Sequence, residues 1–262
     1  MKTVRNALAL LGYFTVNQPE WGLSDLARAS AQDKATTLRL LKPLVDAHFL
    51  FQDAQNRKYR LGHAVLTLAR IREACFPLSL ALQAVLQSLA ADAAELAHAA
   101  VPDNAAMMTI GSAEAQQRAT RVFIDPSEPL PFHATASGIA YLAFGDPAWR
   151  EKTLKARSFA AVTPHTPTQA AQIRALVEQT RQRGYAVSDQ TFENEVVGVA
   201  VPFFDEHGCA QGTLAIATPT SRIGPDTVLR HAGLLARASR QLSRDLGSLL
   251  NADWEQATAG LN

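Results

Sequence analysis

A cluster of hydrogen-bond donors lies in the segment DKATTLRLLKPLVDAHFL, residues 33–50. An apolar stripe recurs in it at helical spacing and would face a core: Leu38, Leu41, Leu44 and Val45. The side chains left facing outward suit phosphate oxygens and base edges, and they lie in the first two turns, where recognition helices touch DNA. The expected contacts with double-stranded DNA are Lys34, Ala35, Thr36, Thr37, Arg39 and Lys42.

The flanking segments would hold this helix in place. Residues 22–30, GLSDLARAS, predict a preceding helix with Ser24 as its N-cap, and Asp33 suits the positive end of the next one. Residues 49–61 predict a hairpin wing whose polar tip adds three contacts, Asn56, Arg57 and Lys58. Two helices, a turn and a wing predict a winged helix-turn-helix. The alternative is an amphipathic helical hairpin that only packs on another surface; the joint presence of wing and helices favours DNA binding.

Charge is distributed unevenly along the chain. Residues 1–74 contain 11 Lys and Arg against 6 Asp and Glu, a net charge of +5, whereas residues 75–262 contain 14 against 18, a net charge of −4. A basic patch confined to one module is the electrostatic footprint expected of a nucleic-acid reader.

Length and composition limit the remaining possibilities. The 262 residues have room for about two domains at typical domain size. No apolar run reaches the roughly 18 residues that a transmembrane helix needs, so we expect a cytoplasmic protein with no membrane partner. Cys75 and Cys209 show no metal-ligand spacing and fit reduced thiols, and we expect neither a cofactor nor a metal.

The pattern predicts four segments: a winged helix-turn-helix at 1–62, a linker helix at 63–76, a second domain at 77–250 and a frayed tail at 251–262. A first helix at 2–16 would close the core of the winged domain through Val4, Ala7, Leu8, Leu11 and Phe14.

The second domain alternates between strands and helices. After a helix at 78–91, strands are predicted at 95–101, 105–111, 120–124, 185–189, 196–204 and 210–218. Helices are predicted at 135–144, 147–156, 168–183 and 225–249. This mixture predicts an α+β body with an antiparallel sheet and helices against it.

Three blocks of the sequence resemble the IclR family of bacterial transcriptional regulators. They are KATTLRLL with YRLG at 34–41 and 59–62, PFHATASGIAYLA at 131–143, and RQRGYAVSD with AVPFFDEHG at 181–189 and 200–208. The resemblance implies a GAF-like effector-binding domain, and a homodimer joined largely through the DNA-binding domains and the helix after the wing, often as a dimer of dimers. It also implies a regulator whose affinity for an operator is controlled by a small organic acid.

The sequence departs from the family in the turn before the recognition helix and in the effector pocket. Ala31-Gln32-Asp33 replaces the usual Gly-Leu-Pro of that turn. Thr191 and Glu195 replace a usual Glu and Gly, Gly198 replaces a common Cys, and Ala215-Ile216-Ala217 replaces Ser-x-Ser. Fewer donors and more space favour an aromatic or bulkier acid over a two-carbon keto acid.

The expected effector site combines the start of the helix at 134–138, whose free N–H groups suit a carboxylate, with nearby segments. Its expected residues are Ser127, Glu128, Ala134, Thr135, Ala136, Ser137, Asp189, Gly198, Ala200, Ala215 and Ala217.

Groups that could serve catalysis are scattered through the second domain: His98, His133, His165, Asp189, Ser137 and Cys209. None lies in a nucleophile motif, because Ser137-Gly138 lacks the glycine that precedes the serine of a G-x-S-x-G elbow. We expect His98 to pack in the core or the pocket, His133 to lie at a helix entry or pocket rim, and no catalytic residues. The alternative is an enzymatic or small-molecule-binding domain with an attached DNA-binding head.

Overall fold

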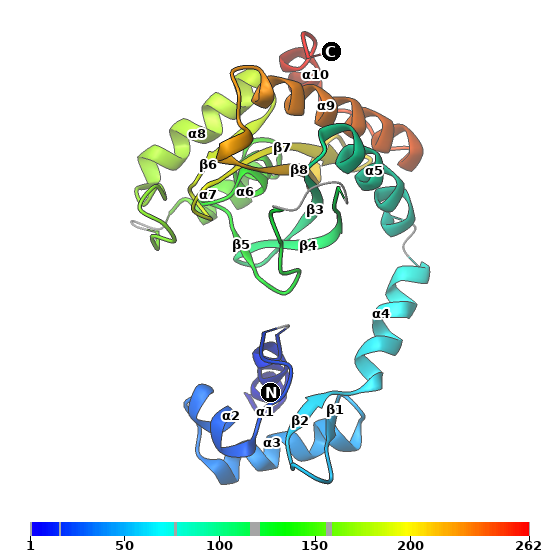
Figure 1. Cartoon of the computed structure of the whole chain (residues 1–262), viewed down its shortest axis with the longest axis vertical. Coiled ribbons are helices and arrows are strands. Elements are labelled where there is room, and N and C mark those ends of the chain that lie inside the picture. Colours follow the sequence, from blue (N-terminus) through cyan, green and yellow to red (C-terminus); the bar gives the residue numbers. More distant parts are fainter. Residues whose placement is uncertain (1, 16, 76–77, 116–120, 156–158, 262) are drawn as a thin grey trace. The chain divides into compact units, whose positions relative to one another are not determined.

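The computed structural model describes residues 2–15, 17–75, 78–115, 121–155 and 159–261. The chain divides into two compact units, Met1–Pro77 and Leu78–Asn262 (Figure 1).

The N-terminal unit is a winged helix-turn-helix. Its elements are α1 (Lys2–Ala9), the 3₁₀ helix η1 (Leu10–Tyr13), α2 (Leu23–Ala29), α3 (Lys34–Asp46), β1 (Leu50–Gln52), β2 (Tyr59–Leu61) and α4 (His63–Cys75). Strands β1 and β2 are antiparallel and form the wing. One cluster of buried side chains holds the unit together: Ala7, Leu10, Phe14, Leu26, Leu40, Leu41, Leu44, Leu50 and Tyr59.

The first helix differs from the prediction for 2–16. It is α-helical only to Ala9 and continues as the tighter η1, which turns Leu10 into the core and leaves Val4 and Leu8 more than half exposed. Ser24 is not the N-cap of α2; that position belongs to Gly22, whose carbonyl accepts the N–H of Leu26.

The C-terminal unit is an α+β body built on one antiparallel sheet. Its strands are β3 (Leu96–Asp103), β4 (Ala106–Ala113), β5 (Leu130–Pro131), β6 (Ala186–Asp189), β7 (Val196–Phe204) and β8 (Ala210–Pro219), in the order β5-β4-β3-β8-β7-β6. Its helices are α5 (Leu78–Ala93), α6 (Ala136–Phe144), α7 (Pro147–Thr153), α8 (Ala170–Arg183), η2 (Thr220–Arg222), α9 (Thr227–Leu246) and α10 (Ala252–Ala257).

Helices cover both faces of this sheet. Gly111, the register partner of Ala99, faces Leu86 of α5, and α5 packs beside α9. The neighbouring residue His98 points to the other face, where its ring meets Ser137 of α6. Every residue of α6 is buried, because it lies between the sheet and α8.

Two expectations for this unit are wrong. Residues 121–124 form no strand, and residue 120 lies outside the described residues; the edge strand is β5 instead. The tail is not frayed: Trp254 of α10 is fully buried, and its indole N–H donates to the carbonyl of Gly184 at 2.8 Å.

Candidate functional site

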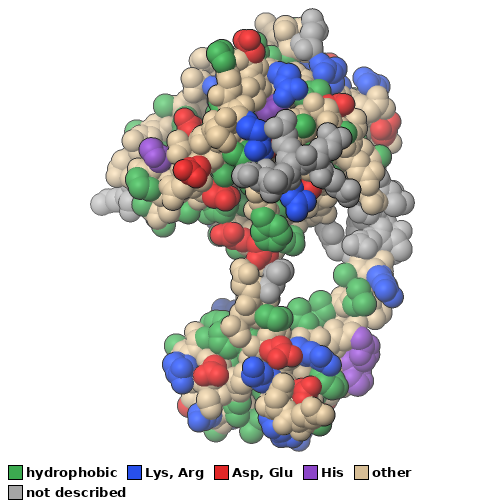
Figure 2. All heavy atoms as spheres, viewed as in Figure 1, with side chains coloured by type: hydrophobic (Ala, Val, Ile, Leu, Met, Phe, Trp, Pro, Cys, Tyr) green, Lys and Arg blue, Asp and Glu red, His purple; other side chains and the backbone are tan. Residues whose placement is uncertain are grey.

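Helix α3 exposes most of the donors expected to read DNA. Lys34, Arg39 and Lys42 have exposed side chains, Ala35 is exposed and Thr36 is half-buried. Lys and Arg side chains are spread over the visible surface of the N-terminal unit (Figure 2). Asp33 caps the helix by accepting the N–H of Thr36 at 2.8 Å, and this hydrogen bond lowers the pKa of the carboxyl.

Thr37 is the exception among the predicted contacts. Its side chain is completely buried, and its hydroxyl donates to the carbonyl of Asp33 at 2.9 Å. Leu38, which we expected in the buried stripe, is 48% exposed, and Leu40 is buried in its place. The buried face is therefore rotated from the predicted one, and a DNA contact through Thr37 is excluded in this conformation.

The wing presents its three predicted residues at the surface. The side chains of Asn56, Arg57 and Lys58 are all exposed. Asp53 shapes the tip by accepting the N–H groups of Gln55 and Asn56 at 2.8 and 3.1 Å, and these bonds lower the pKa of its carboxyl. The Asn56 side chain accepts the N–H of Lys58 at 2.8 Å, so the basic pair stands on an ordered turn.

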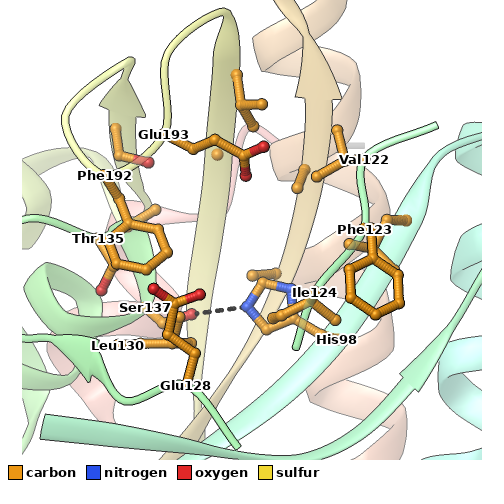
Figure 3. Close-up of a pocket in the computed structure, with 17 residues that line it drawn as sticks. His98, Val122, Phe123, Ile124, Glu128, Leu130, Thr135, Ser137, Phe192 and Glu193 are labelled. Atoms are coloured by element: carbon orange, nitrogen blue, oxygen red, sulfur yellow. Dashed lines mark hydrogen bonds between the residues drawn. The ribbon is translucent and has the colours of Figure 1, made fainter. Parts of the chain in front are cut away.

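A cavity of about 80 Å³ lies in the C-terminal unit between the sheet and the start of α6 (Figure 3). Because a water molecule needs about 10–15 Å³ of cavity volume, the cavity has room for a small molecule. Its lining residues are mostly apolar: Leu96, His98, Val122, Phe123, Ile124, Glu128, Leu130, Thr135, Ala136, Ser137, Ser188, Phe192, Glu193, Val196, Gly198, Ala215 and Ala217.

Three neighbouring strands create the floor of this cavity: β7 and β8 supply the small residues Gly198, Ala215 and Ala217, and β3 supplies Leu96 and His98. In the register of the sheet, Ala217 lies between Leu96 and Gly198, and Ala215 pairs with His98. Paired residues share one face, so these side chains all point toward α6. A Cβ at Gly198 would meet the hydroxyl of Ser188 at 2.6 Å, so the glycine keeps the floor open.

The N-terminus of α6 forms one end of the cavity. Thr135 caps the helix by accepting the N–H of Gly138 at 3.0 Å. Gly138 is required because a Cβ there would collide with the backbone of Phe132. The first N–H groups of a helix have no partner within it, so Ala136 and Ser137 present oriented donors beside the cavity.

His98 is the buried polar group of the floor. Its Nε2 lies 3.4 Å from the hydroxyl of Ser137, whereas its Nδ1 is buried with no hydrogen-bond partner among the described residues. Burial lowers the pKa of His98 to about 4, so the imidazole is neutral at physiological pH.

Two carboxylates stand at the mouth. Glu128 and Glu193 are both exposed and line the cavity, and Figure 3 shows them on opposite sides of it. Partial loss of contact with water raises the pKa of Glu193, and the charge of the neighbouring Glu128 raises it further.

The loop between β6 and β7 carries Phe192 and Glu193 and is held down by hydrogen bonds. The hydroxyl of Thr191 donates to the carbonyl of Ala134 at 2.6 Å, joining the loop to the entry of α6. Gln190 and Glu195, at its two ends, have positive φ angles of 57° and 60°. Such backbone conformations are costly for these residues and persist where the surroundings impose them.

Of the residues expected at the effector site, the structure brings seven to the cavity: Glu128, Thr135, Ala136, Ser137, Gly198, Ala215 and Ala217. Four others lie outside it. Asp189 is exposed and points to the opposite sheet face from Ser188, because side chains alternate along β6. Ser127 bonds instead to Asp125, and Ala134 and Ala200 are buried in the packing around the cavity.

Sequence reasoning missed the residues that reach the cavity from distant segments. They are Leu96, Val122, Phe123, Ile124, Ser188, Phe192, Glu193 and Val196. Strand alternation could have added Leu96 to His98. Residues 122–128 of the wall belong to no helix or strand and left no periodic signal.

The other groups considered for catalysis have separate structural surroundings. His133 bonds through Nε2 to the carbonyl of Ala160 at 2.9 Å, and its ring packs on Phe159. His165 is exposed. Cys209 is half-buried after the β7–β8 turn, and burial raises the pKa of its thiol.

Within the described ranges, no three His, Cys, Asp or Glu residues are grouped to hold a metal ion. No described helix has the length and apolar character to span a bilayer.

Comparison with known proteins covers both units. Residues 76–244 match the family described as bacterial transcriptional regulator IclR C-terminal, and residues 3–54 match the IclR helix-turn-helix domain. The chain is 39% identical to a solved structure from Silicibacter sp. named as an ICLR transcriptional regulator, with a TM-score of 0.85 over 96% of this chain and 98% of that one.

More distant relatives also align over nearly the whole chain. The transcriptional regulator XynR of Escherichia coli is 26% identical over 94% of this chain and 98% of its own. An IclR homolog from Microbacterium hydrocarbonoxydans, solved as a complex with 4-hydroxybenzoate, shares the fold at 23% identity, with a TM-score of 0.79 over 94% of this chain and 99% of that one.

Proposed function

The chain belongs to the IclR family of bacterial transcriptional regulators, and we propose that an aromatic acid bound in the cavity beside α6 controls how tightly its winged helix-turn-helix binds an operator. The observation that carries this proposal is the meeting of an apolar, small-residue floor with the N-terminus of a buried helix.

The N-terminal unit supplies the DNA contacts. We infer that Lys34, Ala35, Thr36, Arg39 and Lys42 of α3 lie in the major groove, where exposed donors in the first turns of a recognition helix reach phosphates and base edges. The wing residues Asn56, Arg57 and Lys58 lie against the adjacent backbone.

We propose that the protein acts as a homodimer. Leu66, Leu68 and Ile71 of α4 are each more than half exposed, as are Val4 and Leu8 of α1. Large apolar side chains exposed on two helices of one unit favour association with a second copy. A twofold dimer would then read two inverted half-sites.

The character of the cavity supports an aromatic acid as the effector. A carboxylate fits the oriented N–H groups at the start of α6, and the ring fits among Phe192, Ile124 and Leu130. Gly198 and Ala217 offer few polar partners to a two-carbon keto acid. The relative from Microbacterium was solved with 4-hydroxybenzoate, an acid of this class.

Ser137 and His98 form a serine–histidine pair, but we propose no catalytic role for it. In a Ser-His-Asp triad, a third group bonded to the other ring nitrogen fixes the tautomer of the histidine base. Nδ1 of His98 has no such partner in the described chain. The relatives that match the chain are transcriptional regulators.

The test requires an operator and a ligand titration. DNA recovered by the full-length protein from a random-sequence pool serves as the operator, and gel-shift titrations are run with benzoate, 4-hydroxybenzoate, glyoxylate or pyruvate. We expect an aromatic acid to change the operator Kd by about fivefold or more, the size of a typical allosteric coupling, and the keto acids to leave it unchanged. A response to glyoxylate or pyruvate alone would overturn the effector assignment.

A further inference from the structure

The charged side chains that line the cavity are negative. Glu128 and Glu193 are its only ionisable acidic residues, and no Lys or Arg is among the lining residues described by the structure. Both carboxylates are at the mouth, where the pKa of Glu193 is raised by burial and by its acidic neighbour. Arg121, which precedes the wall residue Val122, is already paired with Glu114 at 3.0 Å. The mouth therefore repels a carboxylate.

The inner end of the cavity has the opposite preference. The start of α6 presents the N–H groups of Ala136 and Ser137, and a helix N-terminus favours negative charge. His98 is more than nine-tenths buried there with Nδ1 unpaired, and leaving such a nitrogen without a partner is unfavourable unless a ligand supplies one. Figure 3 shows its ring inside the cavity, between Ser137 and Ile124.

We propose that the cavity selects acids that carry a hydrogen-bond-donating group, a hydroxyl or an ammonium, at the end of the molecule away from the carboxylate. The carboxylate lies at the start of α6 beside His98, and the donor lies at the mouth between Glu128 and Glu193. This inference rests on the proposed function of the cavity as the effector site.

Charge and hydrogen bonding both produce this selectivity. A plain aromatic acid leaves the two carboxylates facing an apolar ring edge, which removes water from them and returns no hydrogen bond. A hydroxyl or ammonium in that place donates to a carboxylate, and hydrogen bonds to ionised groups are about twice as strong as neutral ones. The ammonium also compensates the charge of the acid pair.

Calorimetry on the full-length protein with benzoate, 4-hydroxybenzoate and 4-(aminomethyl)benzoate tests the inference. We expect at least one of the donor-bearing acids to bind about tenfold more tightly than benzoate, the value of one charge-assisted hydrogen bond. The Glu193→Gln and Glu128→Gln variants should each bind the donor-bearing acids more weakly than the wild type does. Each should bind benzoate more tightly. If the variants lose more affinity for 4-(aminomethyl)benzoate, the preferred donor is an ammonium. If they lose more affinity for 4-hydroxybenzoate, the preferred donor is a hydroxyl.

The matched control is Glu206→Gln, which removes the same charge from the exposed turn at the far end of the β7–β8 hairpin. It should leave all three affinities unchanged. If wild-type protein binds benzoate best, or if neither cavity variant changes the preference, the inference is wrong. The Ala217→Phe variant distinguishes a wrong selectivity inference from a wrong effector site. If this variant binds none of the three acids, the site is right and only the inferred selectivity is wrong. If it binds all three as the wild type does, the effector site is elsewhere.

Discussion

Filling the cavity from the protein side should abolish the effector response without harming DNA binding. Ala215 and Ala217 of β8 line the floor and are 1% and 8% exposed. We predict that Ala217→Phe, and separately Ala215→Leu, occupies the space that a ligand ring would take. The recognition helix belongs to the other compact unit, so its own surface is unchanged.

The expected magnitudes follow from the size of the cavity. Unfilled volume costs about 24 cal/mol per Å³, so the cavity of about 80 Å³ corresponds to about 2 kcal/mol that a new side chain can partly recover. Overpacking costs about 1–3 kcal/mol, so the two effects nearly offset each other and the Tm should move by only about 2–4 °C. A ring that buries on the order of 100 Å² gains about 2.5 kcal/mol, and its exclusion should raise the effector Kd by about 70-fold.

Gel-shift titrations with and without 4-hydroxybenzoate measure both properties in one assay. The operator Kd without ligand should match that of the wild type, and the ligand-dependent change should disappear. Gln211→Leu places the same leucine side chain at an exposed position of the same strand and should respond normally. A normal response from both cavity variants would refute the placement of the effector site.

Three further outcomes are expected. Arg39→Ala should weaken operator binding by about 1–3 kcal/mol if the guanidinium contacts a base, with effector binding retained; an unchanged affinity in gel shifts would refute the placement of the recognition helix. Trp254→Ala should lower the free energy of unfolding by about 3–5 kcal/mol in urea titrations, since it removes a fully buried ring and its bond to Gly184; a loss under 1 kcal/mol would contradict the packed tail. Burial lowers the pKa values of His98 and His231 to about 4, so the folded chain binds fewer protons than the unfolded one between pH 6.5 and 4. Stability should therefore fall as pH drops through that range, by at most about 1.4 kcal/mol per pH unit for each histidine, and His231→Gln should flatten the slope.

Most helices and strands could be predicted because each carries its own periodicity and end signals. The N-terminal recognition segment shows the limit of that reasoning. Leu38, Leu40 and Leu41 lie too close together for periodicity alone to fix which of them faces the core. Packing decides, and it buries Thr37 with Leu40 and Leu41.

The errors elsewhere arise from contacts between distant segments. Nothing local to Trp254 indicates that Gly184 will accept a hydrogen bond from its indole. The mouth residue Glu193 lies on a loop that hydrogen bonds hold to distant segments: Thr163 and Thr166 donate to its backbone, and Thr191 donates to the entry of α6. The floor could be predicted because alternation along strands is a local rule, whereas the wall and mouth depend on tertiary structure.

The connection from α5 to β3 suggests how the cavity can influence the rest of the chain. Helix α5 ends at Ala93 and β3 begins at Leu96, a floor residue. The joint between them is stiff: Ala94 has a φ of 57°, and the buried Glu95 receives two hydrogen bonds of 2.6 Å from Arg222. We therefore expect α5 to move together with β3 when a ligand shifts that strand, and α5 follows the N-terminal unit directly in sequence. Because a ligand alters DNA affinity only if it binds one conformation better, we expect this joint to carry the coupling, and Arg222→Gln to weaken the effector's influence on operator Kd more than it weakens effector binding.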